Sequence, residues 1–149
     1  MNKLPIEVYD GQVERNFNIA EFRCKDNGEV LLNKKVLEHI EQLQRFRTWY
    51  NRPMIIVSGY RTLEYNRSIG SNDTSQHVLG VASDIRYPDE FYAFTPERKK
   101  EFLNNIKNKW NKLCKEKGIR GGVGFYDTFF HLDSREGNES MAFWDLRSK

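Results

Sequence analysis

Hydrophobic residues recur at three- and four-residue steps in two long stretches of the chain, which predicts two amphipathic helices. The first begins after Asn33, a residue type suited to capping a helix N-terminus, and ends before Pro53. Its apolar face comprises Val36, Leu37, Ile40, Leu43, Phe46 and Trp49. The second is capped by Thr95, opens with Pro96 and closes at Gly118 after lysines in its last turn. Its buried stripe comprises Phe102, Leu103, Ile106, Trp110 and Leu113.

Short apolar runs elsewhere in the chain predict strands. These runs are MIIV (54–57), VASDI (81–85), GGVGFY (121–126) and FFHLD (129–133). The last two flank a turn at 127–128, and GGVG is expected to turn the chain into the first of them. Residues 16–32 predict a short helix or loop before a brief extended segment, and AFWDLR (142–147) predicts a last strand or a packing tail. We therefore expect one α+β domain over residues 1–149, with helices packed on a small antiparallel sheet.

Composition and charge narrow the class of protein. The 149 residues are 38% hydrophobic and 30% charged, which is typical of a globular chain with one core. The net charge of +3 comes from scattered Lys and Arg, so we expect a solvated surface and no nucleic-acid partner. Cys24 and Cys114 have no metal-binding spacing. Cys114 falls on the apolar side of the second helix, which predicts a buried free thiol, although a disulfide remains open.

The sequence contains no apolar stretch of the roughly 20 residues that a membrane span needs. The first 17 residues, MNKLPIEVYDGQVERNF, also lack the apolar centre of a signal peptide. We therefore expect no membrane insertion and a cytoplasmic location.

Three histidines offer candidate chemistry. His39 lies within the first predicted helix and is expected to be an ordinary surface or helix-edge residue. His77 and His131 differ because each has a carboxylate nearby, Asp84 for the first and Asp133 for the second. Two imidazoles and one carboxylate are typical ligands of a catalytic zinc, which keeps one position open.

The spacing of these residues suits such a site. His77 is expected on a loop and Asp84 on the strand that follows, with Gly80 allowing the chain to turn between them. His131 and Asp133 should share one face of their strand, because side chains alternate along it. A metal-free hydrogen bond between His and Asp is the alternative that spacing alone leaves open.

Several motifs resemble the M15 peptidase family. They are SGYRT (58–62), Asn66, SQHVLGVASDI (75–85), and GVGFY followed by FFHLD. That family comprises zinc D-alanyl-D-alanine carboxypeptidases and phage cell-wall endopeptidases, and it shares a fold with the hedgehog signalling domain. The resemblance is best to the branch with an SGYR…SxHxxGxAxD…HxD signature and extends from about Phe17 to Trp144.

The resemblance implies a zinc ion held by His77, Asp84 and His131. It also implies that Arg61 faces the substrate, where a guanidinium pairs with a carboxylate or stabilises an oxyanion. A structural salt bridge is the alternative for Arg61. Ser75 either hydrogen-bonds the metal site or substrate, or only caps its loop.

The general base is where the sequence departs from many relatives. They carry Glu or Asp three residues before the last His ligand, and that position here is Thr128. Asp133 is the favoured base because it shares the strand face of His131, and Asp127 at the turn is the alternative. A further arrangement makes Asp133 the metal ligand and His131 the acid or base.

The function implied by the resemblance is zinc-dependent hydrolysis of peptide bonds in peptidoglycan stem or cross-link peptides, by carboxypeptidase or endopeptidase action. The small size and the lack of an export signal suit a monomeric phage lytic enzyme, an endolysin. Such an enzyme waits in the host cytoplasm before lysis or travels with the virion. The alternative is a non-catalytic zinc-binding recognition or structural module of the same fold.

Overall fold

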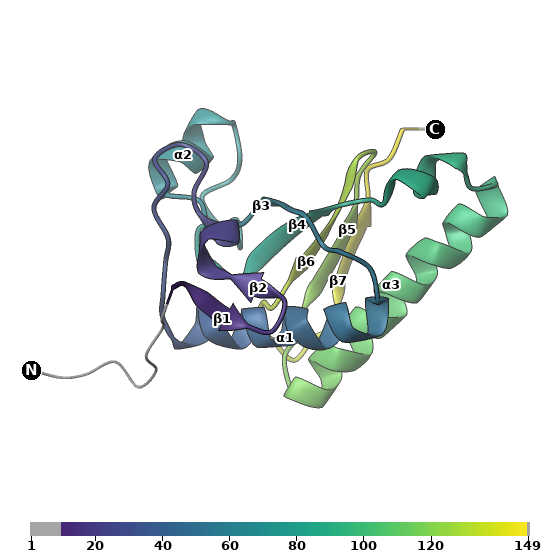
Figure 1. The fold of residues 1–149 in the computed structure, drawn as a ribbon, viewed down its shortest axis with the longest axis horizontal. Coiled ribbons are helices and arrows are strands. Elements are labelled where there is room, and N and C mark those ends of the chain that lie inside the picture. Colours follow the sequence, from purple (N-terminus) through teal and green to yellow (C-terminus); the bar gives the residue numbers. More distant parts are fainter. Residues whose placement is uncertain (1–9, 149) are drawn as a thin grey trace, which may run out of the picture.

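The computed structural model describes residues 10–148, so the expectation about a signal peptide falls partly on residues 1–9, outside the described chain. The helices are α1 (Lys34–Tyr50), α2 (Leu63–Ser68) and α3 (Pro96–Lys117), with 3-10 helices at Ile19–Phe22 and Asp89–Ala93. The strands are β1 (Gln12–Glu14), β2 (Phe17–Asn18), β3 (Ile56–Ser58), β4 (Ala82–Arg86), β5 (Gly122–Phe125), β6 (Phe129–Asp133) and β7 (Ala142–Asp145) (Figure 1). The predicted α+β class is confirmed.

The main sheet has five strands in the order β3-β4-β6-β5-β7. Its pairs are antiparallel except at one edge, where β7 runs parallel to β5. The connection between β6 and β7 carries the chain past β5, so that β7 lies at the outer edge of the sheet and runs parallel to β5. The sheet is therefore mixed, and its antiparallel part carries the predicted site.

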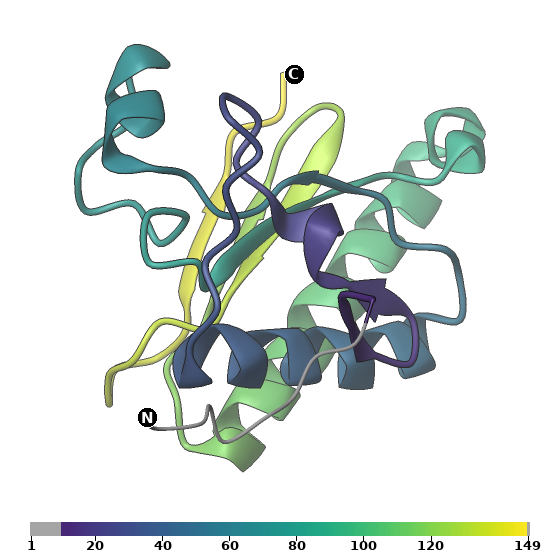
Figure 2. The ribbon, with the colours of Figure 1, turned by 60° about the vertical axis from the view of Figure 1, so that its left-hand side comes forward.

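The two long helices pack against one face of this sheet (Figures 1 and 2). The core joins α1 and α3 side chains to alternate strand residues: Ile85, Val123, Phe125, Phe130 and Leu132. The intervening strand residues, among them Asp84 and His131, face away from the helices because side chains alternate along a strand. The short helix α2 lies apart from α1 and α3 in both views. One face of the sheet therefore packs into the core, and the opposite face carries the candidate site residues.

Helix α1 begins as predicted, because the Asn33 side chain accepts a hydrogen bond from the Val36 amide at 3.0 Å. It ends at Tyr50, where Asn51 adopts a left-handed conformation with φ 53°. The end is therefore set before Pro53 is reached. Trp49 was expected on the buried face, but it is 41% exposed, and its ring lies tilted by 56° to that of Phe46 with centres 5.4 Å apart. It therefore lies at the edge of the buried face.

Helix α3 has both predicted ends. Thr95 accepts a hydrogen bond from the Arg98 amide at 3.2 Å, and Gly118 closes the helix with φ 77°. Cys114 on this helix is a buried free thiol, as predicted, and burial raises its pKa to about 12. Cys24 is also free and buried, so the two cysteines form no disulfide.

Short elements depart most from the prediction. The strand expected at 54–57 is found two residues later, as β3 from Ile56 to Ser58. Met54 packs into the core and Ile55 is 51% exposed, and both precede the strand. The β1–β2 ribbon and helix α2 had no clear sequence signal. Within the described residues, no helix is both long enough and apolar enough to cross a membrane.

Candidate active site

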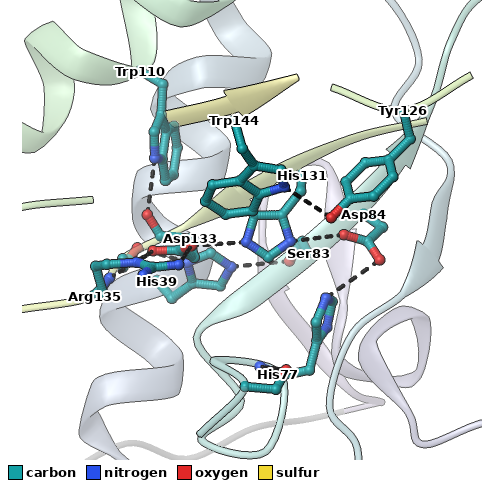
Figure 3. Close-up of polar contacts among 12 residues, drawn as sticks. His39, His77, Ser83, Asp84, Trp110, Tyr126, His131, Asp133, Arg135 and Trp144 are labelled. Carbon is teal, nitrogen blue, oxygen red and sulfur yellow. Dashed lines mark hydrogen bonds and ion pairs between the residues drawn. The ribbon is translucent and has the colours of Figure 1, made fainter. Parts of the chain in front are cut away.

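His77, Asp84 and His131 come together on the face of the sheet opposite the long helices (Figure 3). Asp84 on β4 lies directly opposite His131 on β6 in the antiparallel register. His77 arrives from the turn before β4, which Gly80 closes with φ 72°. Each of the three buried residues offers one ligand atom, and these atoms lie within 4.8 Å of one another. The predicted ligand set is thus assembled by two strands and a turn.

The His77 ring is held so that a lone pair faces Asp84. Its Nδ1 lies 2.7 Å from the Gly59 carbonyl, which only accepts, so Nδ1 carries the proton. Nε2 of the neutral ring is then an acceptor, 3.3 Å from Asp84 Oδ2. Gly59 is required here because a Cβ would lie 2.7 Å from the Phe22 backbone. Two facing acceptors favour a cation between them, which fits a metal.

His131 lies between two carboxylates. Its Nδ1 is 2.9 Å from Asp84 Oδ1, and its Nε2 is 2.7 Å from Asp133 Oδ2. Burial lowers the pKa of His131, but the hydrogen bonds with Asp133 and Asp84 outweigh it and raise the pKa to about 9. If His131 held a metal through Nδ1, the metal would replace one proton, and Nε2–H would still donate to Asp133. This is the usual way that a carboxylate orients a metal-binding histidine.

The Asp84 carboxylate faces both imidazoles. Burial alone would raise its pKa, but the hydrogen bond with His131 holds the pKa well below the usual range for Asp. Asp84 is therefore ionised and offers its charge to a cation. The donor set of two imidazoles and one carboxylate fits zinc.

Asp133 is fully buried behind His131. Its carboxylate accepts two hydrogen bonds from the Arg135 guanidinium, at 2.9 and 2.7 Å, and one from the Arg135 amide at 3.1 Å. Burial would raise its pKa, but the hydrogen bonds with His131 and Arg135 hold it well below the ordinary value. Gly122 makes room for it, because a Cβ there would lie 2.4 Å from Asp133 Oδ2. Asp133 is thus oriented toward His131.

Arg61 is fixed on the other side of Asp84. Its Nη2 lies 3.6 Å from Asp84 Oδ2, Nε donates to Ser58 and Nη1 donates to Asn66, each at 3.3 Å. Asn66 is itself buried and donates to the Asn72 carbonyl at 2.8 Å. The guanidinium is therefore rigid, beside the ligand carboxylate and at the wall of a cavity.

A cavity of about 470 Å³ opens over these ligands. One wall is polar and comes from the segment 71–76, and the other is aromatic. The aromatic wall comprises Tyr126, Phe129 and Trp144. Ser75 lines the polar wall, and its hydroxyl accepts a hydrogen bond from the His77 amide at 3.3 Å, so it caps the loop. The cavity is large enough for a segment of peptide.

Comparison with known proteins agrees with this geometry. The model of the family described as Peptidase M15 matches residues 15–133, which is most of the chain. The chain belongs to the M15 peptidase family. Its members are zinc-dependent hydrolases of peptide bonds, so the cluster of His77, Asp84 and His131 is the M15 peptidase's candidate zinc site. No curated protein matches the chain.

The other predicted carboxylate of this M15 peptidase lies away from the site. Asp127 is on the β5–β6 turn and accepts hydrogen bonds from the Ser148 amide and hydroxyl, at 2.8 and 2.7 Å. Those hydrogen bonds lower its pKa. Within the described residues, neither Asp127 nor Asp133 lines the cavity, where Asp84 is the one carboxylate.

His39 differs from the prediction, which placed it at the surface or helix edge. It is buried, and its ring nitrogens lie 2.6 Å from Ser134 Oγ and 2.9 Å from Ser83 Oγ. Burial lowers its pKa to about 3, so the ring is neutral. It joins α1 to the two strands that carry the ligands. The prediction was wrong because only tertiary pairing supplies the two hydroxyls.

Sequence reasoning also missed two residues of the aromatic wall. Trp144 was expected only to anchor the end of the chain, yet its ring lies 5.0 Å from that of His131. Tyr126 accepts a hydrogen bond from the Trp144 indole at 2.8 Å. The alternation within AFWD was the one available signal, because it places Phe143 and Trp144 on opposite faces of a strand.

Proposed function

We propose that this M15 peptidase hydrolyses peptide bonds in peptidoglycan stem or cross-link peptides, as a single-domain, monomeric lytic enzyme of the phage type. The observation that carries the proposal is the convergence of His77, Asp84 and His131 beneath a peptide-sized cavity. The substrate class is supported by the sequence resemblance to cell-wall peptidases.

The zinc, when bound, supplies an activated water and polarises the scissile carbonyl. Residues of the chain itself orient the substrate and stabilise the negative charge that develops on it. Arg61 is held beside Asp84, where its fixed guanidinium can stabilise negative charge on the carbonyl oxygen. The Ser75 hydroxyl accepts from its own loop and keeps its proton free to donate to substrate.

The role of Asp133 follows from its surroundings. As a general base it would have to reach a water in the cavity, but it is buried and held by Arg135 and His131. We propose that Asp133 positions His131 for metal binding. The general-base role stays a prediction, and the Asp133→Asn variant in the Discussion separates the two.

A non-catalytic zinc-binding module is the second candidate. It is favoured by Thr128 at the position of the acid in many relatives. The cavity lining supports it too, because among the described residues that lining offers Asp84 as its one carboxylate. Such a module would bind zinc and peptide without turnover.

The test measures zinc stoichiometry on the purified chain and release of amino groups from purified peptidoglycan, with and without chelator. One zinc per chain with chelator-sensitive cleavage supports the peptidase, and product masses identify the bond. His77→Ala should lose both zinc and cleavage, whereas the surface variant Arg67→Lys should keep both. One zinc with no cleavage across several wall types would favour the binding module, and no zinc uptake would refute the site.

A further inference from the structure

The aromatic wall of the cavity holds a hydroxyl that the established features of the site do not use. We infer that Tyr126 is a catalytic residue, whose hydroxyl donates a hydrogen bond to the oxygen of the scissile carbonyl as negative charge develops there. We further infer that Trp144 is a positioning residue that fixes this hydroxyl. Both inferences rest on the proposed peptidase function.

The hydrogen bond between the two residues sets the direction of the hydroxyl proton. The indole nitrogen of Trp144 can only donate, and it lies 2.8 Å from the Tyr126 oxygen. The tyrosine oxygen is therefore the acceptor, and its own proton must point elsewhere. Within the described chain, this proton has no protein acceptor, and Tyr126 lines the cavity. The proton is available to a substrate oxygen.

The tyrosine ring is held in one orientation. It stacks on Phe129 with ring centres 4.4 Å apart and planes 16° from parallel. Figure 3 shows the Tyr126 hydroxyl turned toward Trp144, on the side of the site where Asp84 and His131 meet. A donor that is already oriented loses no reorganisation energy when charge develops, which is the condition for strong electrostatic stabilisation.

Trp144 is fixed more tightly than a surface tryptophan. Strand β7 pairs in parallel with β5, which places Trp144 beside Gly124. A Cβ on Gly124 would lie 2.3 Å from the indole, so the ring occupies the space that the glycine leaves. The Arg135 guanidinium lies 5.5 Å from the ring centre and His131 lies 5.0 Å from it. The indole N–H therefore has little freedom.

The composition of the cavity explains why such a donor is useful. Its ligand carboxylate, Asp84, is committed to the metal, and Arg61 supplies positive charge beside it. Tyr126 adds an uncharged donor on the aromatic wall. It donates a hydrogen bond without transferring its proton, so no other group has to return a proton to it. Tyr126 lies within the residues that the family model matches, whereas Trp144 lies on β7, beyond the end of that match at Asp133.

The test compares Tyr126→Phe, Trp144→Phe and the double variant, all zinc-loaded, on a peptidoglycan peptide. Tyr126→Phe keeps the ring stack, so we expect kcat to fall about 100-fold with KM nearly unchanged, the range for a lost oxyanion donor. Trp144→Phe should lower kcat about tenfold, which is less than the loss of the donor itself would cause, because the hydroxyl is misdirected rather than removed. If Trp144 acts through the hydroxyl, the double variant should be no worse than Tyr126→Phe.

A second readout does not depend on turnover. A phosphinic peptide mimics the tetrahedral state, and calorimetry should show that Tyr126→Phe weakens its binding more than that of the product peptide. Tyr92→Phe and Trp49→Phe remove the same groups from exposed positions outside the cavity and should change neither readout.

The outcomes separate this inference from the proposed function. A wild-type chain that binds zinc without cleaving refutes the peptidase proposal, and this inference with it. An active wild type with unchanged kcat in Tyr126→Phe overturns the inference alone. Multiplicative effects of the two substitutions overturn the positioning role. Should Tyr126→Phe fail to fold, an unchanged kcat in Trp144→Phe decides against the inference.

Discussion

At the scale of single residues, the position of His131 between Asp84 and Asp133 governs the site. A histidine with a carboxylate at each ring nitrogen has one orientation open to it. The ring cannot flip without breaking two short hydrogen bonds with charged partners. The candidate metal ligand is therefore already oriented by these hydrogen bonds.

Asp133→Asn tests this positioning directly. The variant preserves the shape of the side chain but weakens the hydrogen bonds that it accepts from His131 and Arg135. We therefore expect zinc affinity to fall about 10- to 100-fold. Competition with a chromogenic chelator measures the change, and Asp127→Asn on the exposed turn is the matched control. Full zinc affinity together with lost cleavage would instead support Asp133 as the general base.

His39 makes a second residue-level prediction. His39→Ala leaves the buried Ser83 hydroxyl and the half-buried Ser134 hydroxyl without their partner, and a buried unsatisfied group costs about 1–3 kcal/mol. We expect a lower free energy of unfolding by urea denaturation, while zinc still binds. A stability equal to that of the wild type would mean that the helix contributes no fixed polar contact to the ligand strands.

At the scale of elements, strand β5 shapes the site by what it lacks. Gly122 and Gly124 lie on the same face, under Asp133 and Trp144 respectively. A side chain at either position would take the volume of a functional group. The glycines that were expected to form a turn thus make room for Asp133 and Trp144.

Gly124→Ala should displace the indole, since its Cβ would lie 2.3 Å from the Trp144 ring. We expect a loss of about 1–3 kcal/mol in stability from overpacking and a fall in kcat like that of Trp144→Phe. Thermal unfolding and steady-state kinetics measure the two effects. Zinc content should be unchanged, because the three ligands lie on other elements; a loss of zinc would show that β5 supports them too.

The elements that could be predicted from the sequence are those whose ends are marked by neighbouring residues. Asn33, Thr95 and Gly118 mark helix ends through hydrogen bonds and backbone angles within a few residues. The clustering of His77, Asp84 and His131 was also accessible, because the motifs of the family resemblance include all three residues and strand alternation fixes the faces. The parallel pairing of β7 and the burial of His39 depend on contacts far apart in sequence. No local pattern encodes them.

At the scale of the whole molecule, the core and the site occupy opposite faces of one sheet. The core residues of α1 and α3 do not include the metal ligands. We therefore expect folding not to require the ion, unlike in small zinc domains whose core is the metal.

Chelator treatment tests this separation. We expect the far-UV circular dichroism to persist and the melting temperature to fall, because a bound ligand at 1,000 times its Kd stabilises a protein by about 4 kcal/mol. Re-addition of zinc should restore the melting temperature. Loss of the far-UV signal on chelation would show that the ligand face and the core fold together.

The contact between Trp144 and His131 gives the enzyme a built-in optical reporter. Of the other tryptophans, Trp110 is fully buried in the core, with its indole nitrogen donating to the Asp133 carbonyl, and Trp49 is exposed on α1. Any cation that binds His131 alters the charge beside the Trp144 ring, 5.0 Å away, and so alters its emission. Metal loading can then be followed by intrinsic fluorescence without a label, and Trp144→Phe should remove most of the signal, leaving only what Trp110 contributes through its hydrogen bond to Asp133.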